Sequence, residues 1–327
     1  MENTNPLPEE KSAKKSDQGQ SQDQSDQSQN QSQDQSFSRE VQYDRKQVGD
    51  GVRERAAQMS MADPAIVKRM NFKTFEVDLP SGGDVYPEGH PVRRTGGKVL
   101  VRQMTAADED ILNNRQLIKN KMAIDTLLTR CFVEPQDLDV NTLLPGDKSI
   151  ITVVIRINGI GEEYVVSVRC PVCGKVSDNE TYHLNKVQIK RVDEDNVAQR
   201  TGNNRFKFKL KMSQRDCEIK LLNGYEDREI DRIIEDSRKK RGQVEETTTR
   251  LLFMIESLDG VTDKGKIKEM LTVLPAGDSK QIRQVYDKIS PDVLMIEKDF
   301  MCSNPDCMEI SEVTVPIDTG FFWPELV

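Results

Sequence analysis

Histidine, tryptophan and the common catalytic motifs are scarce or absent. The sequence of 327 residues has two histidines and one tryptophan, and aromatic residues make up 5% of it. No Gly-x-Ser-x-Gly, phosphate-binding loop or His-Glu-x-x-His pattern appears. His90 lies in a segment rich in proline and glycine, and His183 lies in a predicted strand, where a single histidine is more often structural than catalytic. We therefore predict that the protein is not an enzyme.

Long apolar segments are also missing. No stretch approaches the roughly 18 apolar residues that a membrane-spanning helix needs, and residues 1–4 begin no apolar signal region. We therefore expect a protein that contacts no membrane and is cytoplasmic where it is made. The apolar share of 35% is low for a globular protein, and most of the deficit lies at the N-terminus.

Excess positive charge is the third absence. The net charge is -8, which disfavours a general nucleic-acid binder because phosphate contacts need a basic surface. The basic run at residues 238–241 is more typical of a solvated helix end than of a binding patch.

The N-terminal segment contains almost nothing apolar. Residues 1–52 are dominated by Gln, Ser, Asp, Asn and Lys. Such a segment cannot bury enough surface to offset the entropy of ordering it, so we expect a disordered tail or linker. Order should begin near Arg53.

The remaining sequence predicts alternating helices and strands. Thr105 stands where a helix N-cap belongs, and acidic residues follow it in the first turn. The predicted strands are 71–79, 98–104, 163–169 and 181–192, the predicted helices are 106–119, 121–132 and 148–157, and a polar linker covers 193–204.

The second half of the sequence weakly repeats the first. Ile111 matches Ile230, each near the start of an acidic helix. The spacing between matched residues increases steadily to Cys170 and Cys302, as a duplication with small insertions requires. We therefore expect two α+β halves, 53–192 and 193–327, each ending in a cysteine turn.

Paired cysteines are the main functional signal. Six cysteines in so long a chain do not form a dense disulfide framework, so in a reducing compartment pairs indicate metal ligands. Cys170 and Cys173 form a Cys-x-x-Cys-Gly turn between predicted strands, and Cys302 and Cys307 lie between two apolar segments. Two thiolate pairs supply a closed tetrahedral zinc shell. The sequence predicts one structural zinc site at Cys170, Cys173, Cys302 and Cys307.

Other interpretations of these cysteines stay open. An iron–sulfur cluster uses the same ligands. A redox Cys-x-x-Cys motif needs a strand-to-helix setting, whereas the flanks here predict a hairpin. A site without any metal is the third alternative. Cys131 is expected to be a small buried residue on a helix.

Together these features predict an α+β fold. It has two similar halves, each with helices and a β-hairpin, joined by a zinc-ribbon-like four-cysteine site and preceded by a disordered tail. Aromatic residues at 321–323 are expected to dock on the core rather than to anchor a partner.

Three short motifs follow one another in an order typical of a known family. They are Leu-Pro-Ser at 79–81 with Thr-x-x-Asp-Glu at 105–109, Ile-Glu-Ser-Leu-Asp-Gly at 255–260 ahead of Leu274 and Asp278, and a cysteine pair before Phe-Phe-Trp-Pro at 321–324. From about residue 72 onward the chain resembles the baseplate hub assembly proteins of T4-type contractile-tailed phages and their tail assembly chaperone relatives. It differs from the smaller members by its Gln/Ser tail and its apparent doubling.

The resemblance implies a non-enzymatic assembly factor or structural component of a phage baseplate hub, acting by protein–protein binding. Its partners would be baseplate hub or tail proteins, or a second copy, with no nucleic acid and no membrane. It would act in the host cytoplasm during virion assembly, and a component that stays would be found in the virion baseplate.

The residues themselves leave one rival, a zinc-ribbon nucleic-acid-binding protein. Basic residues near the first cysteine pair favour it, and acidic residues near the second pair oppose it. The basic residues are Lys175, Lys186, Lys190 and Arg191, and the acidic ones are Asp306, Glu309 and Glu312.

Overall fold

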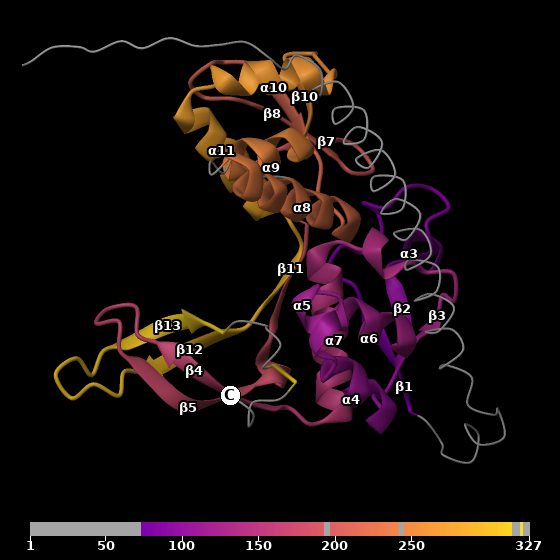
Figure 1. Cartoon of the computed structure of the whole chain (residues 1–327), viewed down its shortest axis with the longest axis vertical. Coiled ribbons are helices and arrows are strands. Elements are labelled where there is room, and N and C mark those ends of the chain that lie inside the picture. The colour runs from indigo at the N-terminus through magenta and orange to yellow at the C-terminus, as the bar shows by residue number, and fades with distance from the viewer. Residues whose placement is uncertain (1–72, 193–196, 242–244, 316–320, 323–327) are drawn as a thin grey trace, which may run out of the picture. The chain divides into compact units, whose positions relative to one another are not determined.

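The computed structural model describes residues 73–192, 197–241, 245–315 and 321–322 (Figure 1). The predicted tail at 1–52, the predicted start of order near Arg53, and Trp323 lie outside these residues. The prediction of an α+β fold is confirmed, because helices alternate with several small antiparallel sheets.

The first half builds a small sheet covered by helices. Its strands pair antiparallel in the order β1-β2-β3, and a long helix, α7, follows them. The elements are β1 (Thr74–Asp78), α3 (Pro91–Arg94), β2 (Lys98–Arg102), α4 (Ala106–Leu112), α5 (Arg115–Lys119), α6 (Ala123–Cys131), β3 (Phe132–Glu134), the 3-10 turn η1 (Val140–Thr142) and α7 (Pro145–Gly159).

The single helix predicted at 106–119 is wrong, because the structure divides it into α4 and α5. Asn113 ends α4, and the side chain of Asn114 accepts hydrogen bonds from Gln116 N (3.0 Å) and Leu117 N (3.2 Å). Asparagine is a strong N-cap because its side-chain oxygen satisfies free N–H groups of the first turn. A second helix therefore starts where the pattern predicted continuation.

The second half has the same plan with one more strand. The sheet order is β10-β9-β8-β7. The elements are β7 (Gln199–Gly202), β8 (Arg205–Lys209), β9 (Asp216–Ile219), α8 (Gly224–Arg241), α9 (Glu246–Met254), β10 (Ile255–Leu258), α10 (Lys264–Thr272) and α11 (Ala276–Ile289). The linker predicted at 193–204 is therefore wrong in its last part, since β7 pairs there with β8.

Each half ends in a hairpin. A short two-stranded ribbon joins the halves, with one strand after the first hairpin and one strand before the second. β4 (Glu163–Arg169) pairs with β5 (Val176–His183), and β12 (Ile296–Met301) pairs with β13 (Ile310–Thr314). β6 (Gln188–Lys190) from the first half pairs with β11 (Asp292–Leu294) from the second. The strand predicted at 181–192 is thus wrong as one element, because the turn η2 (Leu184–Lys186) separates β5 from β6.

The two halves repeat the same buried acidic contact. Asp147 in the first turn of α7 accepts hydrogen bonds from Ser81 N (3.0 Å) and the Tyr86 hydroxyl (2.6 Å). Asp278 in the first turn of α11 accepts from Met212 N and Ser213 N, both at 2.8 Å. In each half the acid holds the turn after the first long strand, and 66 positions separate Ser81 from Asp147 and Met212 from Asp278.

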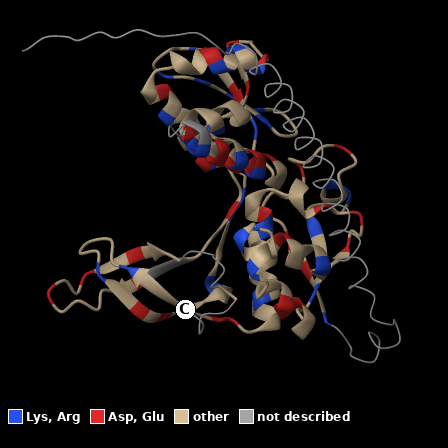
Figure 2. Cartoon of the chain, in the orientation of Figure 1, with Lys and Arg blue, Asp and Glu red and all other residues tan. Residues whose placement is uncertain are grey.

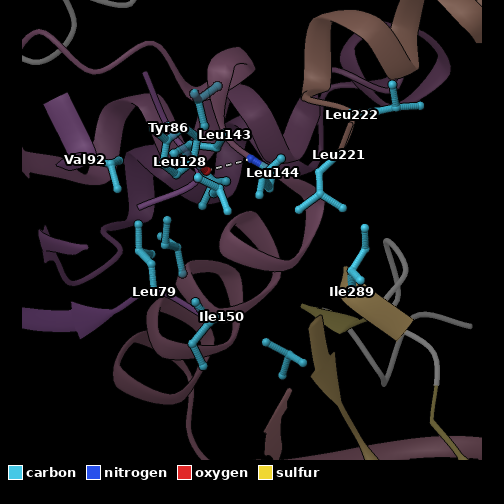
Figure 3. Close-up of a cluster of buried hydrophobic side chains, with 14 of the residues drawn as sticks. Leu79, Tyr86, Val92, Leu128, Leu143, Leu144, Ile150, Leu221, Leu222 and Ile289 are labelled. Carbon is cyan, nitrogen blue, oxygen red and sulfur yellow. Dashed lines mark hydrogen bonds between the residues drawn. The ribbon is translucent and has the colours of Figure 1, made fainter. Parts of the chain in front are cut away.

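The hydrophobic core continues through both halves. Figure 3 shows part of it, where Leu144 from the first half lies beside Leu221 from the second. The Leu144 N–H donates to the Tyr86 hydroxyl at 2.9 Å, as the dashed line marks. These contacts fix the N-terminus of α7, which begins at a proline well suited to the first helical position.

The halves also approach each other closely outside this core. A Cβ at Gly146 would lie 2.1 Å from the Pro291 carbonyl oxygen, so only glycine permits α7 to meet the start of β11. Phe321 and Phe322 are buried, and Arg156 Nε donates to the Phe321 carbonyl oxygen at 2.9 Å. The expected docking of these two aromatics on the core is what the structure has.

Candidate metal centre

The first cysteine turn closes the β4–β5 hairpin. Cys170 N donates to the Lys175 carbonyl oxygen (2.8 Å), and Gly174 N donates to the Cys170 carbonyl oxygen (3.0 Å). Gly174 has a φ of +74°, a left-handed conformation that glycine adopts without steric cost. These bonds curl the chain so that Cys170 and Cys173 face the same point.

The second turn, between β12 and β13, is longer by two residues but closes in a similar way. Cys302 N donates to the Glu309 carbonyl oxygen (3.0 Å), and Cys307 N donates to the Asn304 carbonyl oxygen (2.9 Å). Asn304 N also lies 3.4 Å from Cys302 Sγ. Backbone N–H groups that point at a cysteine sulfur stabilise the thiolate form, which is the form that binds metals.

The structure brings all four predicted cysteines together. Their sulfur atoms lie within 4.8 Å of one another, with 4.0 Å between the sulfurs of Cys170 and Cys307 and 3.5 Å between those of Cys173 and Cys302. A tetrahedral ion with metal–sulfur bonds of about 2.3 Å separates its ligand sulfurs by about 3.8 Å. The four sulfurs therefore have the spacing of a closed tetrahedral metal shell.

The two hairpins are also linked by side chains that no sequence motif marks. Ser177 Oγ donates to Ser303 Oγ at 2.8 Å, and Lys175 Nζ donates to the Ser303 carbonyl oxygen at 3.2 Å. A small separate core lies beneath the turns and consists of Val168, Cys170, Phe300, Cys302 and Val313. No spacing in the sequence pairs Ser177 with Ser303, because 126 positions separate them.

The electrostatics of the site favour a bound cation. The backbone N–H of Lys175 lowers the pKa of the Cys173 thiol to about 6. The N–H of Asn304 acts in the same direction on Cys302, but burial and the adjacent thiols raise the pKa of Cys302 to about 12. Thiolates this close repel one another, so all four ionise together only when a cation neutralises them.

The other titratable side chains near the core do not join this site. Burial raises the pKa of Cys131 and that of Cys217 to about 12, as for inert apolar cysteines. His90 Nε2 lies 2.9 Å from Thr142 Oγ1, and its ring stacks on Tyr86. Among the described residues, the four cysteines are the only group of three or more metal-ligating side chains close enough to share an ion, and His183 is not part of it.

In the parts of the chain that the structure describes, no helix is both long and apolar enough to cross a membrane. Acidic and basic residues are interspersed along α8 (Figure 2). The fold and the site thus define an α+β protein with a closed four-cysteine centre between two hairpins.

The family follows from comparison with known proteins. A family model described as T4 bacteriophage base plate protein matches residues 70–323, which is most of the chain. The chain belongs to this family and is a structural component of a phage baseplate. Neither a curated protein nor a solved structure matches it.

Proposed function

We propose that this baseplate protein acts at the hub without catalysis, as an assembly factor or as a subunit that stays in the particle. Its surface would bind hub or tail proteins in the host cytoplasm during virion assembly. Family membership supports a role in the baseplate. A closed set of four sulfur ligands supports a structural role for any metal, since it leaves no open position for water or substrate.

The metal that fits the site best is zinc, held by Cys170, Cys173, Cys302 and Cys307. The observation that carries this proposal is that all four sulfurs lie within 4.8 Å of one another. An iron–sulfur cluster distributes its four ligand thiolates over two or more iron atoms, so thiolates on different irons stand farther apart than the ligands of one ion. Metal binding would then stabilise the hairpins, whose own core is very small.

We also propose that the halves, 53–192 and 193–327, arose by duplication. The supporting features are the matched order of strands and helices and the two buried aspartates at equivalent helix starts. The zinc centre would take one cysteine pair from each half. The metal would therefore tie the halves together, and the tail at 1–52 would extend the reach of the chain toward its partners.

Metal analysis tests the site. Protein purified without chelators is expected to contain one zinc per chain, and a cobalt-substituted sample is expected to show the absorption of tetrahedral cobalt with four sulfur ligands. Cys131→Ala, which removes a buried thiol outside the site, serves as the matched control and should keep the metal. Iron with sulfide, or no metal at all, would contradict a zinc centre.

Co-expression tests the biological role. The full chain is expected to co-purify with a hub or tail protein of the same phage when the two are produced together. A chain that stays a solitary monomer with every such protein would contradict the role. Salt-sensitive binding to DNA or RNA would instead support the zinc-ribbon nucleic-acid module.

A further inference from the structure

The outer face of the β12–β13 hairpin exposes large apolar side chains. Met301 and Ile310 are directly opposed across the two strands and are 59% and 63% exposed, and Met308 in the turn is 64% exposed. The residues on either side of Met301 point the other way, since Phe300 and Cys302 are buried in the small core that includes two of the four cysteines. We name Met301, Met308 and Ile310 the hairpin patch.

The alternation of the strands explains why these residues have no internal partner. Successive side chains of a strand point to opposite faces, so burying Phe300 and Cys302 against β4–β5 turns Met301 outward. The sequence nevertheless has methionine and isoleucine at these outward positions. Single exposed apolar residues are ordinary, but opposed ones that group on one hairpin mark an interaction surface.

The hairpin that carries the patch also has four exposed carboxylates. Asp299, Asp306, Glu309 and Glu312 are exposed on the same hairpin, which carries Asp and Glu positions in Figure 2. Within the described residues, none of the four forms an ion pair with a lysine or arginine. An apolar centre with a charged edge is the usual anatomy of a protein–protein interface.

We propose that the hairpin patch docks a second protein of the baseplate, at an apolar surface edged by lysine and arginine. The sign of the carboxylates decides the occupant. A second copy would bring the same carboxylates against these ones, and nucleic acid would bring phosphates, so both are repelled. A basic partner is attracted, and flexible methionine side chains adapt to its apolar surface.

The inference rests on the proposed function, in which a baseplate subunit is the partner and the four cysteines would hold a metal above the small buried core of the hairpins. With a metal bound to its four cysteines, the hairpin would be held in one shape and would lose little conformational freedom on binding a partner. The metal would thus organise the docking surface without contacting the partner.

The test uses full-length, metal-loaded protein and the separately purified baseplate subunits of the same phage. Binding of each subunit is measured for the wild type, for Met301→Ser with Ile310→Ser, and for Glu309→Lys with Glu312→Lys. The matched control is Val273→Ser with Glu269→Lys, which changes an exposed apolar residue just after α10 and an exposed acidic residue on that helix. Metal content and thermal unfolding of every variant show that the hairpin is intact.

The serine variant is expected to bind the partner subunit about tenfold or more weakly, as for loss of a central apolar contact. The lysine variant should associate about tenfold more slowly and lose most of the salt dependence of association. The control variant should bind like the wild type.

Each other outcome overturns a different statement. Equal binding by all variants, with metal retained, would overturn the docking surface and leave the baseplate role standing. Failure of the wild type to bind any subunit would overturn the proposed function itself. A wild-type dimer that the serine variant dissociates, or nucleic-acid binding that the lysine variant strengthens, would overturn a basic protein partner.

Discussion

The two halves of the molecule use the same acidic helix cap but bury it to different depths. In the first half, Asp108 three residues after the N-cap Thr105 is fully buried and pairs with Arg102 (2.7 Å) and Arg130 (3.0 Å). In the second half, Glu226 three residues after Asn223 pairs with Lys220 at 2.6 Å, and its side chain is 22% exposed.

The difference shows that the same capping contact can contribute different amounts of free energy to stability in the two halves. Both acids accept a hydrogen bond from the N-cap backbone N–H, Thr105 N at 2.9 Å and Asn223 N at 3.0 Å. Only the first acid lies beyond the reach of water, so only there would removal leave buried arginine charge without a partner. The cysteine pairs differ from the capping acids, because each acid acts within its own half whereas the two cysteine pairs meet at one common centre.

Removing either cysteine pair should give the largest effect, and the same effect. Cys170→Ser with Cys173→Ser, and Cys302→Ser with Cys307→Ser, are each expected to abolish metal binding, because two thiolates do not complete the tetrahedral shell. Hydrogen exchange should then accelerate in both hairpins while α7 and α11 keep their protection. Metal analysis and exchange mass spectrometry measure this. Retention of metal by either double variant would mean that the halves hold separate sites.

Removing the capping acid should destabilise the protein more in the first half than in the second. Asp108→Ala is expected to lower the free energy of unfolding by about 3 to 5 kcal/mol, as for a broken buried ion pair. Glu226→Ala should cost about 1 kcal/mol, as for a partly exposed pair and a lost cap contact. Urea unfolding measures both, and Glu235→Ala, from an exposed pair on α8 with Lys239, is the control that should change nothing. Equal costs would show that burial does not distinguish the two caps.

The contributions of the two buried aspartates, Asp147 and Asp278, to stability should change with pH in opposite directions. We expect this effect to be smaller than those of the cysteine and capping-acid variants. Burial raises the pKa of Asp147, so its contribution to stability falls as pH rises from about 4 through the raised value. Burial also opposes ionisation of Asp278, but hydrogen bonds from Ser213 and Met212 outweigh it and lower the pKa, so its contribution is lost as pH falls below about 4.

Asparagine variants measure this contrast, because asparagine does not titrate. Relative to wild type at each pH, Asp278→Asn should cost about 1 to 3 kcal/mol at pH 6 and less at pH 3. Asp147→Asn should cost more at pH 3 than at pH 6. Comparison with wild type at each pH cancels any loss of metal in acid. The same direction of change in both variants would contradict the opposed pKa shifts.

Local chemistry in the sequence predicted much of the fold. The N-cap Thr105, the helix that became α7 and the first hairpin strand, β4, follow from residues within a few positions of one another. The break at Asn114 was missed, although asparagine is itself a cap signal, because the apolar pattern continues across it. β7 was missed because its polar sequence forms a strand only by pairing with β8.

Cysteine spacing by itself determined which side chains can hold a metal, because two residues between Cys170 and Cys173, and four between Cys302 and Cys307, let each pair of sulfurs lie on one turn. The scarcity of histidine likewise led to the prediction of a non-enzymatic protein. Only the tertiary structure brought Cys170 within 4.0 Å of Cys307 across 137 positions, buried Asp108 but not Glu226, and turned Met301 outward. Those outcomes depend on which segments, far apart in the sequence, pack against each other and exclude water, and the spacing of residues along the chain does not determine that packing.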